Sequence, residues 1–225
     1  PCGDATVPHS VRKRRPLRPF VPTAAFAAAA ALSTFASAAP LRDIPCPAHE
    51  IGGVVVCRVL DVPEDPDRSA GRTVPLFVMV LRTAAQNPAP DPLFVIAGGP
   101  GQAATEGSFF PRFFSPVRET RDVVLIDQRG TGRSNPLALD PSDADLFVRP
   151  ETNIPPEWGH AALARLQAKA DLTQYTTARA VEDLDAVRRA LGYQRINFYS
   201  TSYGTRVVQY YIKRRPKHVR TAVLK

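Results

Sequence analysis

The sequence predicts an α/β fold in which a mostly parallel sheet is flanked by helices. Two short, continuous apolar runs, at 93–97 and 122–126, are typical of strands that are covered on both faces. A third run at 196–199 follows an amphipathic helical pattern. Strands that alternate with helices favour a parallel sheet, because a crossover helix returns the chain to the same edge. The length of 225 residues suffices for one such domain.

Two longer strands are expected before the apolar runs. Residues 54–62 and 74–82 are rich in β-branched and aliphatic side chains and are separated by turn-forming residues, which predicts a hairpin. The segments 84–92 and 135–157 are punctuated by Pro and are predicted to be loops. Residues 158–170 are expected to form a weak helix.

The second half of the chain holds the clearest helical pattern. Apolar residues recur at helical spacing through 181–191, Thr176 or Thr177 can cap the start, and Gly192 suits a left-handed residue after the end. Two more elements follow, a helix at 203–214 and a strand at 219–224.

The first 38 residues have the three-part composition of a secretory signal. A basic stretch at 12–18 precedes an Ala-rich apolar stretch at 20–35, and residues 36–38 are small enough for cleavage. We therefore expect 1–38 to be a leader and 39–225 to be an exported domain, periplasmic or extracellular. An Ala-rich helix and an uncleaved anchor are the alternatives; polar residues and a proline interrupt the apolar run, so no stable membrane span is expected.

Cysteine usage agrees with export. Cys46 and Cys57 lie on either side of a Gly-Gly pair and can form a disulfide in an oxidising compartment. If the chain is not exported, two unpaired thiols are the alternative.

The positive charge does not indicate a nucleic-acid partner. About half of the formal net charge of +8 belongs to the leader, and the densest remaining basic run, 213–218, suits the last turn of a helix. The Cys and His spacings match no zinc pattern, and the glycines at 98–101 are not followed by the Lys of a phosphate-binding loop. We expect no metal and no nucleotide cofactor.

A candidate nucleophile lies where the third apolar run turns into a helix. A serine in such a turn, here Ser202, projects its hydroxyl from the carboxyl edge of the sheet towards the first amides of the helix. The turn needs small residues two positions before and after the nucleophile. Gly204 meets this need, whereas Ser200 replaces the usual first glycine.

Acyl transfer at this serine needs two preorganised N–H donors for the developing oxyanion. In hydrolases built on such a turn, one donor is the residue after the nucleophile, here Tyr203. The other comes from a loop after an earlier strand, and Gly98 and Gly99 supply a backbone that a substrate can approach closely. A Gly-rich sequence alone is more simply a tight turn. Together with the serine turn, it indicates an oxyanion-binding loop.

Four motifs together resemble the α/β-hydrolase superfamily, and within it the prolyl-aminopeptidase and tripeptidyl-aminopeptidase-like serine peptidases. They are GGPG (98–101), DQRGTGRS (127–134), YTT with EDLDAVRRALG (175–177 and 182–192) and TSYGTRV (201–207). The resemblance implies that Ser202 is the nucleophile, that Tyr203 and Gly98 or Gly99 are the oxyanion donors, and that residues are removed from peptide N-termini. It also implies that Asp127 and Arg129 have structural roles.

The resemblance also implies partners for the serine that this sequence does not supply. In this fold an acidic residue and a histidine follow the nucleophile, but only His218 follows Ser202, in a basic turn typical of a surface. We therefore expect an α/β-hydrolase fold truncated before its last strands and inactive by itself. An esterase or lipase-like hydrolase acting on small esters or amides is one alternative. A non-catalytic binding protein of the same fold, which Ser200 favours, is the other.

Overall fold

A computed structural model of the chain describes residues 40–47, 51–68, 70–106, 114–138 and 156–225. The expected leader, 1–38, lies outside these residues, as does most of the predicted loop 135–157. Among the described residues, no helix combines the length and the apolar character needed to cross a membrane.

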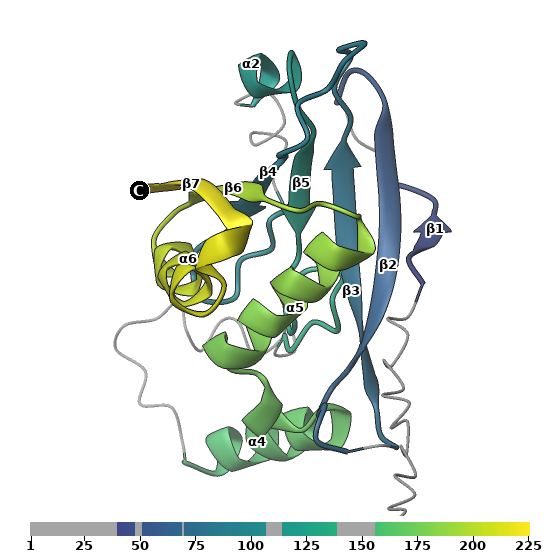
Figure 1. Cartoon of the computed structure of the whole chain (residues 1–225). Coiled ribbons are helices and arrows are strands. Elements are labelled where there is room, and N and C mark those ends of the chain that lie inside the picture. Colours follow the sequence, from purple (N-terminus) through teal and green to yellow (C-terminus); the bar gives the residue numbers. More distant parts are fainter. Residues whose placement is uncertain (1–39, 48–50, 69, 107–113, 139–155) are drawn as a thin grey trace, which may run out of the picture. The chain divides into compact units, whose positions relative to one another are not determined.

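Within these described residues, seven strands form one mixed sheet in the order β1-β2-β3-β5-β4-β6-β7 (Figure 1). The strands are β1 (Arg42–Ile44), β2 (Val55–Pro63), β3 (Thr73–Leu81), β4 (Leu93–Ile96), β5 (Val123–Ile126), β6 (Ile196–Ser200) and β7 (Val219–Leu224). β2 and β3 form the predicted hairpin, and β1, β2, β3 and β5 pair in antiparallel fashion. β4 is parallel to both β5 and β6, and β6 is parallel to β7. The parallel arrangement is therefore confirmed for the strands that carry the candidate motifs.

The helices are also close to those that the sequence predicts. They are α2 (Ser115–Arg118), α4 (Pro156–Lys169), α5 (Thr177–Ala190) and α6 (Tyr203–Arg214), with short 3-10 turns η2 (Leu172–Gln174) and η3 (Pro216–His218). At the start of α5 the Thr176 hydroxyl accepts a hydrogen bond from the Arg179 amide, and after its end Gly192 has a φ of 79°. Both predicted boundary signals of this helix are thus confirmed.

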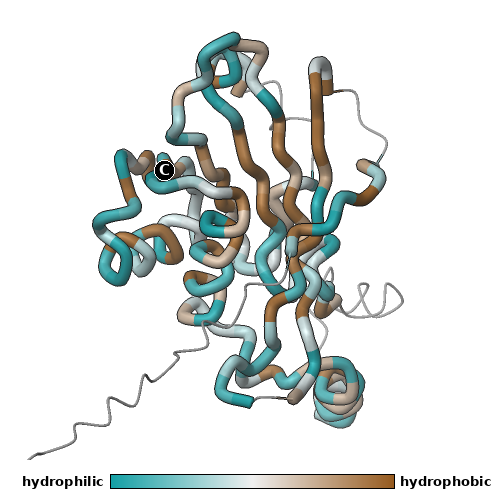
Figure 2. The backbone as a smooth tube through the Cα atoms, turned by 45° about the vertical axis from the view of Figure 1, so that its right-hand side comes forward, coloured by the Kyte–Doolittle hydropathy of each residue, from teal (hydrophilic) through white to brown (hydrophobic). Residues whose placement is uncertain are grey.

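Alternate side chains of the strands form two apolar clusters, one on each face of the sheet. On the first face, strand residues such as Phe94 and Phe198 pack against α5 and α6, which lie side by side in front of the sheet in Figure 1. On the other face, residues such as Phe77 and Val95 pack against Phe114, which immediately precedes α2. All residues of β4 and β5 are buried, and Figure 2 shows apolar residues along the strands of the sheet. This double burial explains their uninterrupted apolar sequence.

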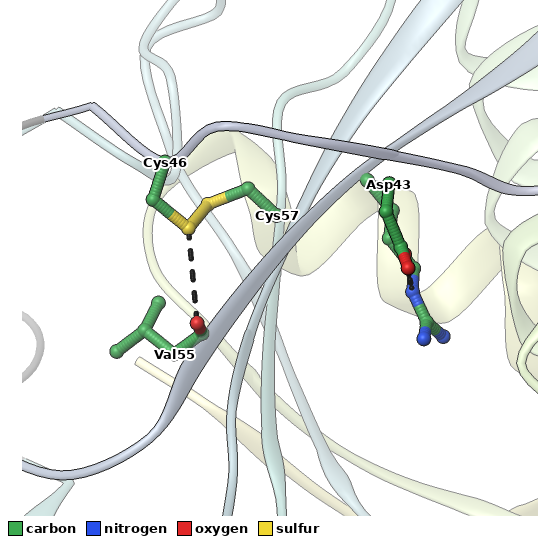
Figure 3. Close-up of a disulfide and its surroundings, with 5 residues drawn as sticks. Asp43, Cys46, Val55 and Cys57 are labelled. Carbon is green, nitrogen blue, oxygen red and sulfur yellow. Dashed lines mark hydrogen bonds and ion pairs between the residues drawn. A yellow bond between two sulfur atoms is a disulfide. The ribbon is translucent and has the colours of Figure 1, made fainter.

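A disulfide fastens the first described segment to the sheet (Figure 3). The Sγ atoms of Cys46 and Cys57 are 2.13 Å apart, and this bond joins the chain after β1 to the first part of β2. An exposed ion pair between Asp43 and Arg58 links the same two strands, at 2.7 Å. Exposed pairs of this kind contribute little free energy, so the covalent link is the stronger fastening of β1.

Candidate active site

Ser202 lies in the turn between β6 and α6, in a backbone conformation that only a few residue types adopt easily. Its φ is 49° and its ψ is −125°, and it directly precedes the first residue of α6. A positive φ at a non-glycine residue is uncommon and costs free energy, and such residues cluster at functional sites. Ser202 is exposed, whereas Ser200, two residues earlier, is fully buried.

The turn is tight because α6 begins almost in contact with the end of β4. A Cβ atom added at Gly204 would lie 2.6 Å from the carbonyl oxygen of Ile96 and 2.7 Å from that of Ala97. No side chain fits at such distances, which explains the glycine at this position. Ser200 fits where glycine was expected, and its hydroxyl donates to the carbonyl oxygen of Val223 on β7, at 3.4 Å.

The glycine loop after β4 lies directly against this turn. A Cβ atom at Gly98 would be 3.0 Å from the Cβ of Ser202 and 3.6 Å from its Oγ. Gly98 is buried and Gly99 is exposed, so the loop runs from the interior to the surface beside the serine hydroxyl. The two motifs, separated by about 100 positions in the sequence, are therefore neighbours because β4 and β6 are adjacent parallel strands.

Few backbone amides around Ser202 remain available to a ligand. The Ser202 amide donates to the carbonyl of Lys225 at 2.9 Å, and those of Gly204 and Thr205 donate to carbonyls of the turn itself. Within the described residues, no acceptor is present for the amide of Tyr203 or for those of Gly98 and Gly99. These are the amides that the sequence singles out as oxyanion donors.

Side chains of the 127–134 turn support the region without reaching Ser202. Asp127 is fully buried and accepts hydrogen bonds from Thr105 and from the amide of Arg133. The Arg129 guanidinium is buried and donates twice to Asp183 of α5, at 2.6 and 2.8 Å. Burial raises the pKa of Asp183, although the hydrogen bonds from Arg129 oppose this effect.

Two side-chain contacts near the site have no local sequence signal. Thr105 contacts Asp127 but belongs to an unremarkable stretch after the glycine loop. Thr177, at the start of α5, hydrogen-bonds through Oγ1 to the Tyr203 hydroxyl at 2.8 Å, so the side chain of the expected oxyanion donor is tied to a neighbouring helix. Only the fold brings these pairs together.

His218 lies on η3, is partly exposed, and its Nδ1 is 2.9 Å from the carbonyl oxygen of Gln194. No histidine among the described residues hydrogen-bonds to Ser202. The same residues contain no group of three or more His, Cys, Asp or Glu side chains placed to hold a metal ion.

A family model described as the alpha/beta hydrolase fold matches residues 91–225. The chain belongs to the α/β hydrolase fold family. The match includes the glycine loop, the 127–134 turn and the Ser202 turn, together with the four strands β4, β5, β6 and β7.

Several curated peptidases are similar to this α/β hydrolase chain. The serine protease Hip1 of Mycobacterium tuberculosis is 31% identical, over 82% of this chain and 39% of the relative. A tripeptidyl aminopeptidase of Streptomyces lividans is 29% identical, over 76% of this chain and 35% of the relative. A probable proline iminopeptidase of Streptomyces coelicolor is 32% identical, over 61% and 33% respectively. The matches therefore span only about a third to two-fifths of these relatives.

Proposed function

We propose that this chain supplies the nucleophile and the oxyanion donors of a serine peptidase that removes residues from the N-termini of peptides. The observation that carries the proposal is the exposed Ser202 hydroxyl, held at a positive φ beside Gly98. The similarity to proteins named as a serine protease, a tripeptidyl aminopeptidase and a proline iminopeptidase supports the peptide substrate.

In the proposed reaction the Ser202 Oγ attacks the carbonyl carbon of the peptide bond. The carbonyl oxygen then becomes an oxyanion, which accepts hydrogen bonds from the amide of Tyr203 and from that of Gly98 or Gly99. These amides have no acceptor among the described residues, which supports this role, because preorganised donors do not have to reorganise as charge develops.

The proton of Ser202 must pass to a base, and the described residues bring no histidine into hydrogen-bond contact with this serine. In this fold the acid and the histidine follow the nucleophile in chain order. We propose that both lie beyond residue 225 in the complete protein, and that residues 39–225 alone do not turn over substrate.

Export is the second part of the proposal. The composition of residues 1–38 and the disulfide between Cys46 and Cys57 both support an oxidising location, in the periplasm or outside the cell. Mass spectrometry of the protein recovered from its host should find an N-terminus at or near Ala39. An intact leader would contradict export.

The peptidase proposal is tested with the protein isolated from its native host, in the length made there. We expect cleavage of aminoacyl- or tripeptidyl-p-nitroanilides with a free amine, and loss of this cleavage when the amine is acetylated. Ser202→Ala should lower the rate at least about a thousand-fold, because it removes the nucleophile. The matched variant Ser200→Ala, at a buried serine of the same turn, should remain active.

The other outcomes identify the rival functions. Hydrolysis of p-nitrophenyl esters that depends on Ser202, without any aminopeptidase activity, would contradict the peptidase and favour an esterase. Failure to hydrolyse either class and failure of Ser202 to react with a fluorophosphonate probe would contradict both and favour a non-catalytic binding protein.

A further inference from the structure

We propose that Asp127 is a positioning residue for the glycine loop, residues 98–105, and that it acts through Thr105 at the end of that loop. The inference rests on the proposed function, because it concerns where the loop places its oxyanion-donating amides. Asp127 itself does not touch the reacting atoms.

The contact between Asp127 and the loop uses both the backbone and the side chain of Thr105. The Thr105 amide donates to Oδ1 of Asp127 at 3.0 Å, and the Thr105 hydroxyl lies 2.9 Å from both carboxylate oxygens. The remaining acceptor position on Oδ2 takes the amide of Arg133 at 3.0 Å. One carboxylate therefore holds the end of the glycine loop and its own turn together.

Asp127 is in turn fixed to the centre of the sheet. Its carbonyl oxygen accepts a hydrogen bond from the Ser134 hydroxyl at 2.8 Å, and that hydroxyl accepts one from the Phe77 amide of β3, also at 2.8 Å. The Asp127 amide donates to the carbonyl of Phe77 at 3.2 Å. A continuous series of hydrogen bonds therefore connects the glycine loop to β3 through Asp127 and Ser134.

Close packing around the carboxylate leaves the loop little freedom. A Cβ atom at Gly132 would lie 2.3 Å from Oδ2 of Asp127 and 2.6 Å from the Cβ of Ala103, so the loop packs directly on the turn. Ala103 and Ala104 are buried as well. Gly98 and Gly99 thus lie on a short segment that is fixed at both ends, by β4, which ends at Ile96, and by the contact of Thr105 with Asp127.

A carboxylate at this buried position carries a cost in desolvation free energy. Burial raises the pKa of Asp127, while the Arg133 amide and the donors of Thr105 lower it. A buried charge is tolerated where its hydrogen bonds are all used, and here they serve to orient a loop rather than to fill space. An ionised carboxylate only accepts hydrogen bonds, so it can receive all these donors at once, which an amide cannot.

The expected kinetic signature follows from what the loop does. An oxyanion donor contributes in the transition state and little in the ground state, so its misplacement lowers kcat and leaves KM nearly unchanged. Removing one such donor outright costs about 100- to 1,000-fold in kcat. A displaced loop should cost less, and we expect a fall of about 10- to 100-fold.

The test compares two threonines whose hydroxyl groups bind different partners. Thr105→Val removes the hydroxyl that binds Asp127. Thr131→Val removes a hydroxyl that binds the Gln128 carbonyl at 2.8 Å within the 127–134 turn. In the host-isolated protein, Thr105→Val and Asp127→Asn should lower kcat and weaken binding of a peptide boronic acid, which forms a tetrahedral adduct, in proportion. Thr131→Val should change neither, and Thr105→Ser should restore both.

A second measurement does not depend on turnover. Hydrogen exchange of the amides of residues 98, 99 and 101–104 should accelerate at least about tenfold in Thr105→Val and Asp127→Asn and remain unchanged in Thr131→Val. The positioning role is wrong if all three variants behave alike, or if KM rises while kcat is retained. Failure of the proposed function is a separate result, because activity would then be absent or independent of Ser202 in the unsubstituted protein.

Discussion

The two halves of the candidate site are held in different ways. The Ser202 turn is fixed by its backbone, through a positive φ and a glycine pressed against β4. The glycine loop is instead held by a side chain of another segment, with Asp127 bound to Thr105. The turn that carries Asp127 is itself fixed to α5 by Arg129 and Asp183. Backbone sterics thus position the nucleophile, and polar side-chain contacts position the region opposite it.

This difference has an energetic consequence. A turn that is fixed by sterics fails when a single atom is added, since backbone carbonyls cannot move aside. A polar contact fails when one partner is lost, because the other is left buried and unsatisfied. The two halves should therefore respond to opposite kinds of substitution, namely added atoms on the serine side and removed atoms on the loop side.

The largest effect is expected on the loop side, from Asp183→Ala. This change leaves the Arg129 guanidinium buried without its counter-charge, and removal of one partner of a buried pair costs about 3–5 kcal/mol. The free energy of unfolding, measured by chemical denaturation of the chain, should fall by that amount.

A double variant separates the contribution of the Arg129–Asp183 ion pair from that of side-chain packing at the same positions. Because burial raises the pKa of Asp183, the ionised pair is held at a desolvation cost, and replacing both partners by apolar residues avoids that cost. Arg129→Met combined with Asp183→Leu should destabilise the chain less than Asp183→Ala alone. If the double variant proved the less stable of the two, the loop side would not depend on charge pairing in the way described.

On the serine side, Gly204→Ala adds a single carbon and should cost about 3 kcal/mol, towards the upper end for overpacking. The new Cβ would lie 2.6 Å from a backbone carbonyl that belongs to β4. Gly159→Ala is the matched control, since it makes the same change in helix α4, where nothing lies within 4 Å. That change should stabilise the chain by about 0.5–1 kcal/mol through helix propensity. Equal effects at the two glycines would remove the steric basis of the turn.

The sequence predicted the serine side better than the loop side, because the serine side has a local sequence pattern and the contacts that hold the loop side do not. The Ser202 turn lies within one stretch of strand, turn and helix, so residue type and spacing suffice to place Ser202 and Gly204. The cap at Thr176 and the end at Gly192 were predictable because they too are local. The contact between Thr105 and Asp127 was not, because only the adjacency of β4 and β5 brings these residues together.

The smallest effect tests whether Ser202 itself is strained. Ser202→Ala keeps the Cβ atom and the positive φ, so its stability should remain within about 0.5 kcal/mol of the unsubstituted chain. Ser202→Gly removes the Cβ atom and with it the cost of this backbone conformation, about 1–2 kcal/mol. The glycine variant should therefore be more stable than the alanine variant, even though glycine elsewhere is destabilising. Thermal denaturation of the two variants side by side measures the difference. A glycine variant less stable than the alanine variant would mean that the turn holds Ser202 without strain, and that contacts rather than backbone geometry orient its hydroxyl.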